Sequence, residues 1–139
     1  MKYLLDTNVI SEIYKPRGNA IVKSFVNSLR EEDVYLSVLS IGEICFGAEK
    51  LKAGPKKTEL LVWLTQTLPE RFGDRIVPLD ADIMAEWGML QARSAKTLPV
   101  FDSLIAASAL ARRLTVVTRN TKDFEGIAGL SLLNPWLEA

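Results

Sequence analysis

Short apolar runs alternate along the chain with longer stretches in which apolar residues recur every three or four positions. Short runs bounded by turn residues are typical of buried strands, and the longer spacing is typical of amphipathic helices. The predicted strands are Tyr3–Leu5, Val34–Ser37, Ile76–Leu79, Thr115–Thr118 and Ser131–Leu133. Pro78 places the third of them at an edge of its sheet, because proline cannot donate a ladder hydrogen bond.

Helical patterns fill the stretches between these strands. One helix begins near Val9 and is stopped by Pro16 and Gly18. Further helices are predicted over residues 21–29, 40–51, 60–68, 80–90 and 101–114. Strands that alternate with helices form βαβ units, so we expect an α/β fold with a parallel sheet covered on both faces. Residues 1–139 are expected to form one domain.

Composition narrows the chemistry that this domain can perform. The chain has no histidine and one cysteine, Cys45, which we expect in the core. Catalysis by Ser-His-Asp or Cys-His groups, an internal disulfide and a histidine or cysteine zinc site are therefore excluded. No apolar run reaches the ~20 residues of a membrane span. Asp6 interrupts the first apolar run, unlike a signal peptide, so we expect a cytoplasmic protein with no membrane partner.

Charge is balanced, with 17 Lys and Arg residues against 17 Asp and Glu residues. A net charge of zero predicts no strong, sequence-independent attraction to nucleic acid. It does not exclude a local basic face. The residues that could contribute to one are Lys15, Arg17, Arg112 and Arg113.

Acidic residues follow the predicted strands. Asp6 ends the first strand, Glu43 lies early in the helix after the second, and Asp102 lies in the first turn of the alanine-rich helix. Asn120 and Asp123 lie in the loop after residues 115–118. Since ligands bind at the carboxyl ends of parallel strands, we expect these residues to converge at one edge of the sheet.

Each acid also has a local explanation. Asp6 can cap the helix that follows it, Ser40 and Glu43 match a capping box, and Asp102 suits the positive end of a helix dipole. Asp80 and Asp82 are interpreted only as residues that open a helix.

Together, the acids predict a repulsive cluster. Such a cluster is stabilised by a divalent cation or by raised pKa values. Oxygen ligands without histidine or thiolate suit Mg²⁺ or Mn²⁺, which support hydrolysis of a phosphodiester. Supporting polar side chains that could orient the carboxylates are those of Thr7, Asn8, Ser40 and Thr118.

Four segments in order carry a family resemblance. They are Leu4–Ile10 (LLDTNVI), Leu39–Ile44 (LSIGEI), Pro99–Ala107 (PVFDSLIAA) and Val117–Phe124 (VTRNTKDF), and Leu133–Trp136 (LNPW) resembles the usual ending. Over essentially its whole length, the sequence resembles the PIN-domain ribonucleases, in particular the VapC-type toxins of bacterial toxin–antitoxin pairs.

The resemblance implies a central parallel sheet of about four or five strands with helices on both sides. It implies an endoribonuclease dependent on Mg²⁺ or Mn²⁺, with Asp6, Glu43 and Asp102 as metal ligands. It also implies an RNA substrate, a homodimer and a cognate antitoxin whose tail covers the acidic pocket.

The fourth acidic position is left open by the sequence. Some members of the family have an acid directly after Thr-Arg, where this chain has Asn120. Asn120 can offer a neutral oxygen or hold a water, and Asp123 can supply the catalytic charge. Whether one metal ion or two bind is equally open.

Two other classes of function compete with the nuclease. One is a non-catalytic RNA- or partner-binding domain on the same fold, for which an acidic pocket would have no use. The other is an aspartyl-phosphate enzyme built on Asp6, or a phosphate-receiver domain, whose acceptor acid belongs after a later strand. Phosphatases of the haloacid dehalogenase type require a second acid two residues after the first. In this chain the residue two positions after Asp6 is Asn8.

Overall fold

Five parallel strands form a single sheet in the computed structural model, which describes residues 1–137. They are β1 (Tyr3–Leu5), β2 (Val34–Ser37), β3 (Ile76–Val77), β4 (Thr115–Val117) and β5 (Leu132–Leu133), in the order β3-β2-β1-β4-β5. The predicted parallel α/β fold is therefore confirmed, and β3 lies at an edge as Pro78 indicates. Residues 138–139 of the predicted domain lie outside the described residues.

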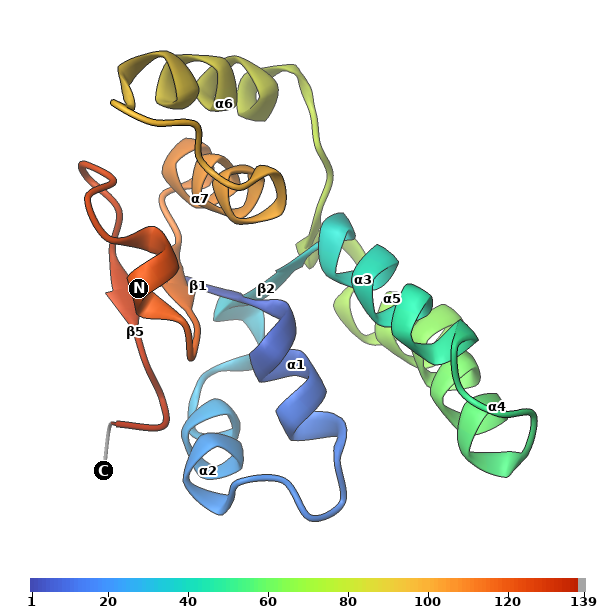
Figure 1. Ribbon diagram of the computed structural model, residues 1–139. Helices are drawn as coiled ribbons and strands as arrows, with labels where there is room; N and C mark the ends of the chain where they lie inside the picture. Colours follow the sequence, from blue (N-terminus) through green and yellow to red (C-terminus); the bar gives the residue numbers. More distant parts are fainter. Residues whose placement is uncertain (138–139) are drawn as a thin grey trace.

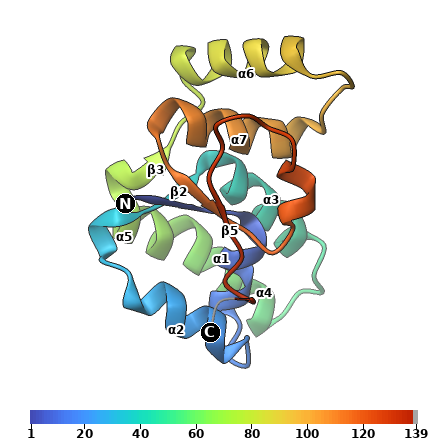
Figure 2. The same cartoon turned by 90° about the vertical axis from the view of Figure 1, so that its left-hand side faces the viewer.

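Helices cover both faces of this sheet (Figures 1 and 2). Figure 1 shows α6 and α7 stacked on one side, with α1 and α2 on the other, and an arm of three helices that runs away from the sheet. The helices are α1 (Thr7–Tyr14), α2 (Ala20–Ser28), α3 (Val38–Glu49), α4 (Pro55–Val62), α5 (Leu68–Phe72), α6 (Ala81–Arg93) and α7 (Val100–Arg112). A π-helical turn over Trp63–Thr67 joins α4 to α5 within the predicted 60–68 helix.

Two hydrophobic cores lie on opposite faces of the sheet. Leu4 and Val116 belong to the core beneath α6 and α7, whereas their neighbours Leu5 and Val117 belong to the core that includes α1 and α2. Successive side chains of a strand point to opposite faces. Because both faces are covered, the strands are apolar throughout rather than alternating.

The start of α3 differs from the prediction. The N-cap is Ser37, whose hydroxyl accepts a hydrogen bond from the backbone N–H of Leu39 at 3.1 Å. Ser40 and Glu43 therefore lie inside the helix, and the capping-box interpretation of this pair is wrong. The helix begins earlier than predicted because β2 runs directly into α3 without an intervening loop.

Smaller differences concern Cys45 and the loop after β4. Cys45 is half-buried and packs at the margin of the second core rather than inside it. Residues Thr121–Phe124 of the predicted loop form a 3₁₀ turn. Among the helices of residues 1–137, none combines the length and the apolar character that a membrane crossing requires.

Candidate active site

Asp6 lies at the carboxyl end of the central strand β1 and is 7% exposed. It caps α1, because its Oδ1 accepts a hydrogen bond from the backbone N–H of Thr7 at 2.8 Å. Its Oδ2 accepts hydrogen bonds from Thr118 Oγ1 at 2.8 Å and Asn8 Nδ2 at 3.2 Å. The predicted cap is confirmed, and hydrogen bonds from Thr7, Thr118 and Asn8 hold the carboxylate in place.

Thr118 and Asn8 connect the ends of β1 and β4. Thr118 is fully buried, and its Oγ1 also accepts hydrogen bonds from Asn8 Nδ2 at 3.3 Å and from the backbone N–H of Asn120 at 3.1 Å. Asn8 Oδ1 accepts from the backbone N–H of Arg119 at 3.1 Å. Both side chains therefore contact Asp6 and hold the loop after β4.

Glu43 reaches the site from α3 and contacts Thr7. Thr7 Oγ1 donates a hydrogen bond to Glu43 Oε1 at 2.7 Å and lies 2.8 Å from Ser40 Oγ. Ser40 is fully buried in the first turns of α3. Since Thr7 follows Asp6 directly in the chain, this hydrogen bond links Glu43 to the segment that carries Asp6.

Asp102 lies in the first turn of α7 and is half-buried. Burial, followed by the charges of Asp123, Asp6 and Glu43 in that order of importance, raises the pKa of its carboxyl to about 6. A neighbouring charge shifts a pKa only over short distances. The four acids that the sequence singled out therefore lie near one another.

Asp123 and Asn120 differ in their place in this cluster. The charge of Asp123 contributes to a raised pKa at both Asp102 and Asp6. The side chain of Asn120 is exposed, whereas its backbone begins the 3₁₀ turn that carries Asp123. The structure thus brings the charge of Asp123 to the site and gives Asn120 a local role in the turn.

Burial and the neighbouring negative charges both disfavour ionised carboxylates at this site. Burial raises the pKa of Asp6, hydrogen bonds from Thr118, Thr7 and Asn8 lower it, and Asp123 raises it again. Among residues 1–137, no Lys or Arg forms an ion pair with Asp6, Glu43, Asp102 or Asp123. A buried carboxylate (Asp6), two half-buried ones (Glu43 and Asp102) and an exposed one (Asp123) fit a divalent cation in their charge and in their oxygen donors.

The carboxylates do not form a closed ligand set. Within the described part of the chain, no three Asp, Glu, His or Cys side chains are close enough together to share one metal ion. Glu43 accepts a hydrogen bond from Thr7, and both oxygens of Asp6 accept hydrogen bonds within the protein. Binding a cation would therefore require rearrangement of side chains, although the donor types are suitable.

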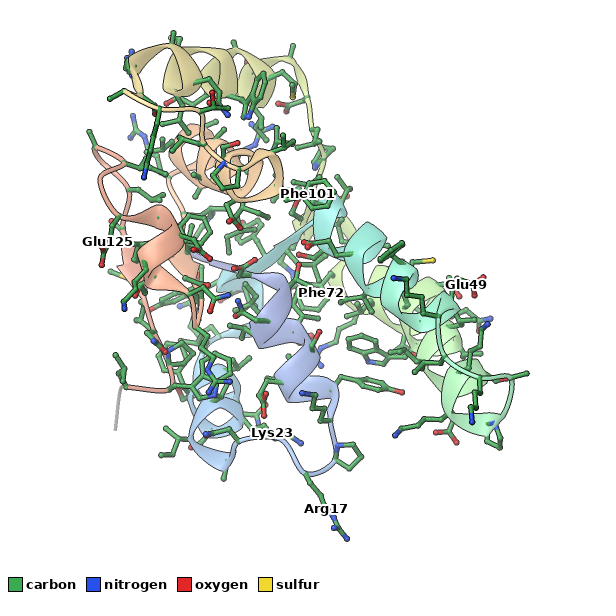
Figure 3. All side chains as sticks on the ribbon, in the orientation of Figure 1. Arg17, Lys23, Glu49, Phe72, Phe101 and Glu125 are labelled. Atoms are coloured by element: carbon green, nitrogen blue, oxygen red, sulfur yellow. The ribbon has the colours of Figure 1, made fainter. Side chains whose placement is uncertain are left out.

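Two cavities open beside Glu43. One of about 730 Å³ runs between α1, α3 and α4, with Thr7 and Glu43 among its lining residues. The rings of Tyr14 and Trp63, which also line it, are tilted against each other at 4.6 Å between centroids. The other, of about 670 Å³, is lined by Val38, Leu39, Gly42, Glu43, Phe46 and Phe101. Figure 3 shows Phe101 where α7 approaches the start of α3.

Sequence analysis missed the contacts that hold the start of α7. Trp87 donates a hydrogen bond from Nε1 to Ser103 Oγ at 2.9 Å, and Gln91 contacts the same oxygen at 3.2 Å. The available signal was the spacing of Trp87 and Gln91, which puts them on one face of a helix. Nothing in the sequence indicated that this face meets Ser103.

Known proteins match this chain over most of its length. The profile of the PIN domain matches residues 3–130. Toxin FitB of Neisseria gonorrhoeae is 38% identical over 136 residues, covering 96% of this chain and 97% of that protein. VapC ribonuclease Y4jK of Sinorhizobium fredii is 35% identical over 136 residues, covering 96% of each chain.

Solved structures share the fold. The crystal structure of FitAcB from Neisseria gonorrhoeae superposes with a TM-score of 0.89 at 37% identity, covering 98% of this chain and 99% of that one. A toxin–antitoxin complex from Klebsiella pneumoniae superposes with a TM-score of 0.72 at 26% identity, covering 96% and 98%. Because the PIN-domain profile covers residues 3–130 and these relatives match nearly the whole chain, this chain belongs to the PIN-domain family.

Proposed function

We propose that this protein is an endoribonuclease of the VapC type and the toxin of a toxin–antitoxin pair. The observation that carries the proposal is the convergence of Asp6, Glu43, Asp102 and Asp123 at the carboxyl edge of the sheet, where none of them forms an ion pair with a Lys or Arg of residues 1–137. Relatives named as a toxin and as a VapC ribonuclease, each matched over 96% of this chain, support it.

The proposed cofactor is Mg²⁺ or Mn²⁺. Asp6, Glu43 and Asp102 would hold the ion, and Asp123 would add charge beside it. When bound, a cation of this kind activates water and offsets negative charge on a phosphodiester. Thr118, Asn8 and Thr7 would hold two of the carboxylates in place, through the hydrogen bonds to Asp6 and Glu43.

A cognate antitoxin is the proposed protein partner. The groove between α1, α3 and α4 begins at Thr7 and Glu43 and is lined further out by apolar side chains such as Ile44, Leu60 and Trp63. A partner segment that fills this groove would reach the carboxylates. The toxin–antitoxin complex matched above supports a partner of this class.

A homodimer is proposed as the resting assembly. Four apolar side chains beside the site are exposed, namely Val38 (37%), Phe46 (66%), Val100 (58%) and Phe101 (52%). Exposed apolar patches of this kind are typical of association surfaces. Light scattering of the purified protein should give twice the monomer mass, and Phe46→Glu should reduce it to one monomer mass.

Cleavage of total cellular RNA tests the proposed activity. Protein freed of antitoxin is incubated with Mg²⁺, with Mn²⁺ or with a chelator, and the cut sites are mapped. We expect cleavage by the wild type with metal only, none by Asp6→Asn, and normal cleavage by the control Asp82→Asn, which alters an exposed acid of α6. Cleavage in the chelator, or by Asp6→Asn, would overturn the proposal. RNA binding without cleavage would favour a non-catalytic domain.

A further inference from the structure

The segment that leads into α7 is held by one side chain of α6. Gln91 Nε2 donates a hydrogen bond to the carbonyl oxygen of Leu98, and Gln91 Oε1 accepts one from the backbone N–H of Leu98, both at 3.2 Å. The amide thus pairs with both polar groups of one residue, as a neighbouring strand would. Leu98 lies four residues before Asp102.

Ser103 is the second point of attachment. Its buried hydroxyl accepts hydrogen bonds from Trp87 Nε1 at 2.9 Å and from Gln91 Nε2 at 3.2 Å, and donates to the carbonyl of Val100 at 2.8 Å. One oxygen therefore joins two side chains of α6 to the first turn of α7. Ser103 is the residue next to Asp102.

Residues 1–137 give the first turn of α7 no other side-chain support of this kind. Its N-cap is Pro99, which makes no side-chain capping hydrogen bond. Within residues 1–137, the carboxylate of Asp102 accepts no protein hydrogen bond, in contrast to that of Asp6. The direction of the Asp102 side chain therefore depends on where the backbone of this turn is placed.

We infer that Trp87, Gln91 and Ser103 are positioning residues, which form a clamp that fixes the backbone of residues 98–103 and thereby presents Asp102 to the other carboxylates. The clamp acts through the backbone and touches no substrate. This inference rests on the proposed function, since it assigns the clamp to the metal-binding acid of α7.

Two variants break the clamp while keeping side-chain volume nearly unchanged. Gln91→Met removes the amide that pairs with Leu98, and Ser103→Ala removes the shared hydroxyl. The matched control is Ser108→Ala on the same helix. Ser108 is also fully buried, but its hydroxyl donates only within α7, to the carbonyl of Leu104 at 2.8 Å.

Three measurements separate positioning from general destabilisation. Hydrogen exchange of metal-free protein reports the amides of residues 98–103. Calorimetric titration with Mn²⁺ reports affinity, and RNA cleavage at varied Mn²⁺ reports the metal concentration at half-maximal rate. Melting temperatures of all variants are compared, because Ser103→Ala removes more hydrogen bonds than Ser108→Ala and its loss of stability must be separated from its loss of metal affinity.

Both clamp variants should exchange the amides of residues 98–103 faster than the wild type. They should bind Mn²⁺ about tenfold more weakly and need about tenfold more Mn²⁺ for half-maximal cleavage, with KM for RNA within about twofold because no RNA contact changes. Ser108→Ala should match the wild type in all three measurements. Wild-type affinity in both clamp variants would overturn the inference. A wild type that neither binds Mn²⁺ nor cleaves RNA would instead overturn the proposed function.

Discussion

Asp6 and Asp80 perform the same local task at two strand ends, but their surroundings differ. Each caps a helix, Asp6 through the backbone N–H of Thr7 and Asp80 through that of Ile83. Asp80 is partly exposed and forms an ion pair with Arg112 of α7. Asp6 is buried and faces other acids. A capping role thus explains the position of both residues, whereas only the surroundings distinguish a structural acid from a candidate catalytic one.

Replacing each of these two caps should give the largest difference. Asparagine caps helices as well as aspartate does, so Asp6→Asn and Asp80→Asn both keep a capping side chain. We expect RNA cleavage to fall by at least about 100-fold in Asp6→Asn and to change less than about twofold in Asp80→Asn. Initial rates with Mn²⁺ measure both. Equal losses in the two variants would show that the cap, and not the cluster, matters.

Removing the hydroxyl that orients Asp6 should have a smaller effect. Thr118→Val keeps the shape of the side chain but leaves Asp6 Oδ2 and the N–H of Asn120 without this partner. The expected costs are about 1–3 kcal/mol in the free energy of unfolding and about tenfold in cleavage rate. Denaturant titration and initial rates measure them.

Thr115→Val is the matched control for that variant. Thr115 begins the same strand and is 8% exposed. Within the described residues its side chain makes no hydrogen bond to the acidic cluster. Its cleavage rate should equal that of the wild type, and a comparable loss in both variants would argue that β4 tolerates no substitution.

The features that could be predicted from the sequence are those whose signal lies within one short segment. Apolar runs located all five strands because both faces of the sheet are buried, and the acids at strand ends followed from the parallel order. Prediction failed where the outcome depends on a distant partner. Ser40 and Glu43 matched a capping box, yet α3 begins earlier at Val38 and Glu43 instead bonds to Thr7, 36 positions away. The contact of Gln91 with Ser103 depends in the same way on how α6 packs on α7.

Loss of the Asp102 proton should make the metal-free protein less stable as the pH rises. In the folded protein its pKa is about 6, whereas an unfolded aspartate titrates near about 3.9. The folded state therefore binds more protons between these values, and this contribution to stability is lost as the pH rises through about 6. The two pKa values set a window of about pH 4 to 6. Within it, the melting temperature in chelator should fall more steeply for the wild type than for Asp102→Asn. Parallel curves would contradict the shift.

Breaking the ion pair of Asp80 should have the smallest effect. The side chains of Arg112 and Asp80 are 38% and 36% exposed, so water and salt screen their attraction. Arg112→Ala should lower the free energy of unfolding by less than about 1 kcal/mol and leave RNA cleavage unchanged. A large loss of cleavage would place Arg112 in the substrate-binding surface instead.

Calorimetric titration of metal-free protein with Mn²⁺ tests the central claim most directly, because it asks whether the repelling carboxylates gather around a cation. We predict saturable binding by the wild type and by Asp80→Asn with the same affinity, and loss of that binding in both Asp6→Asn and Asp102→Asn. Equal binding by all four proteins, or none by the wild type, would contradict the account.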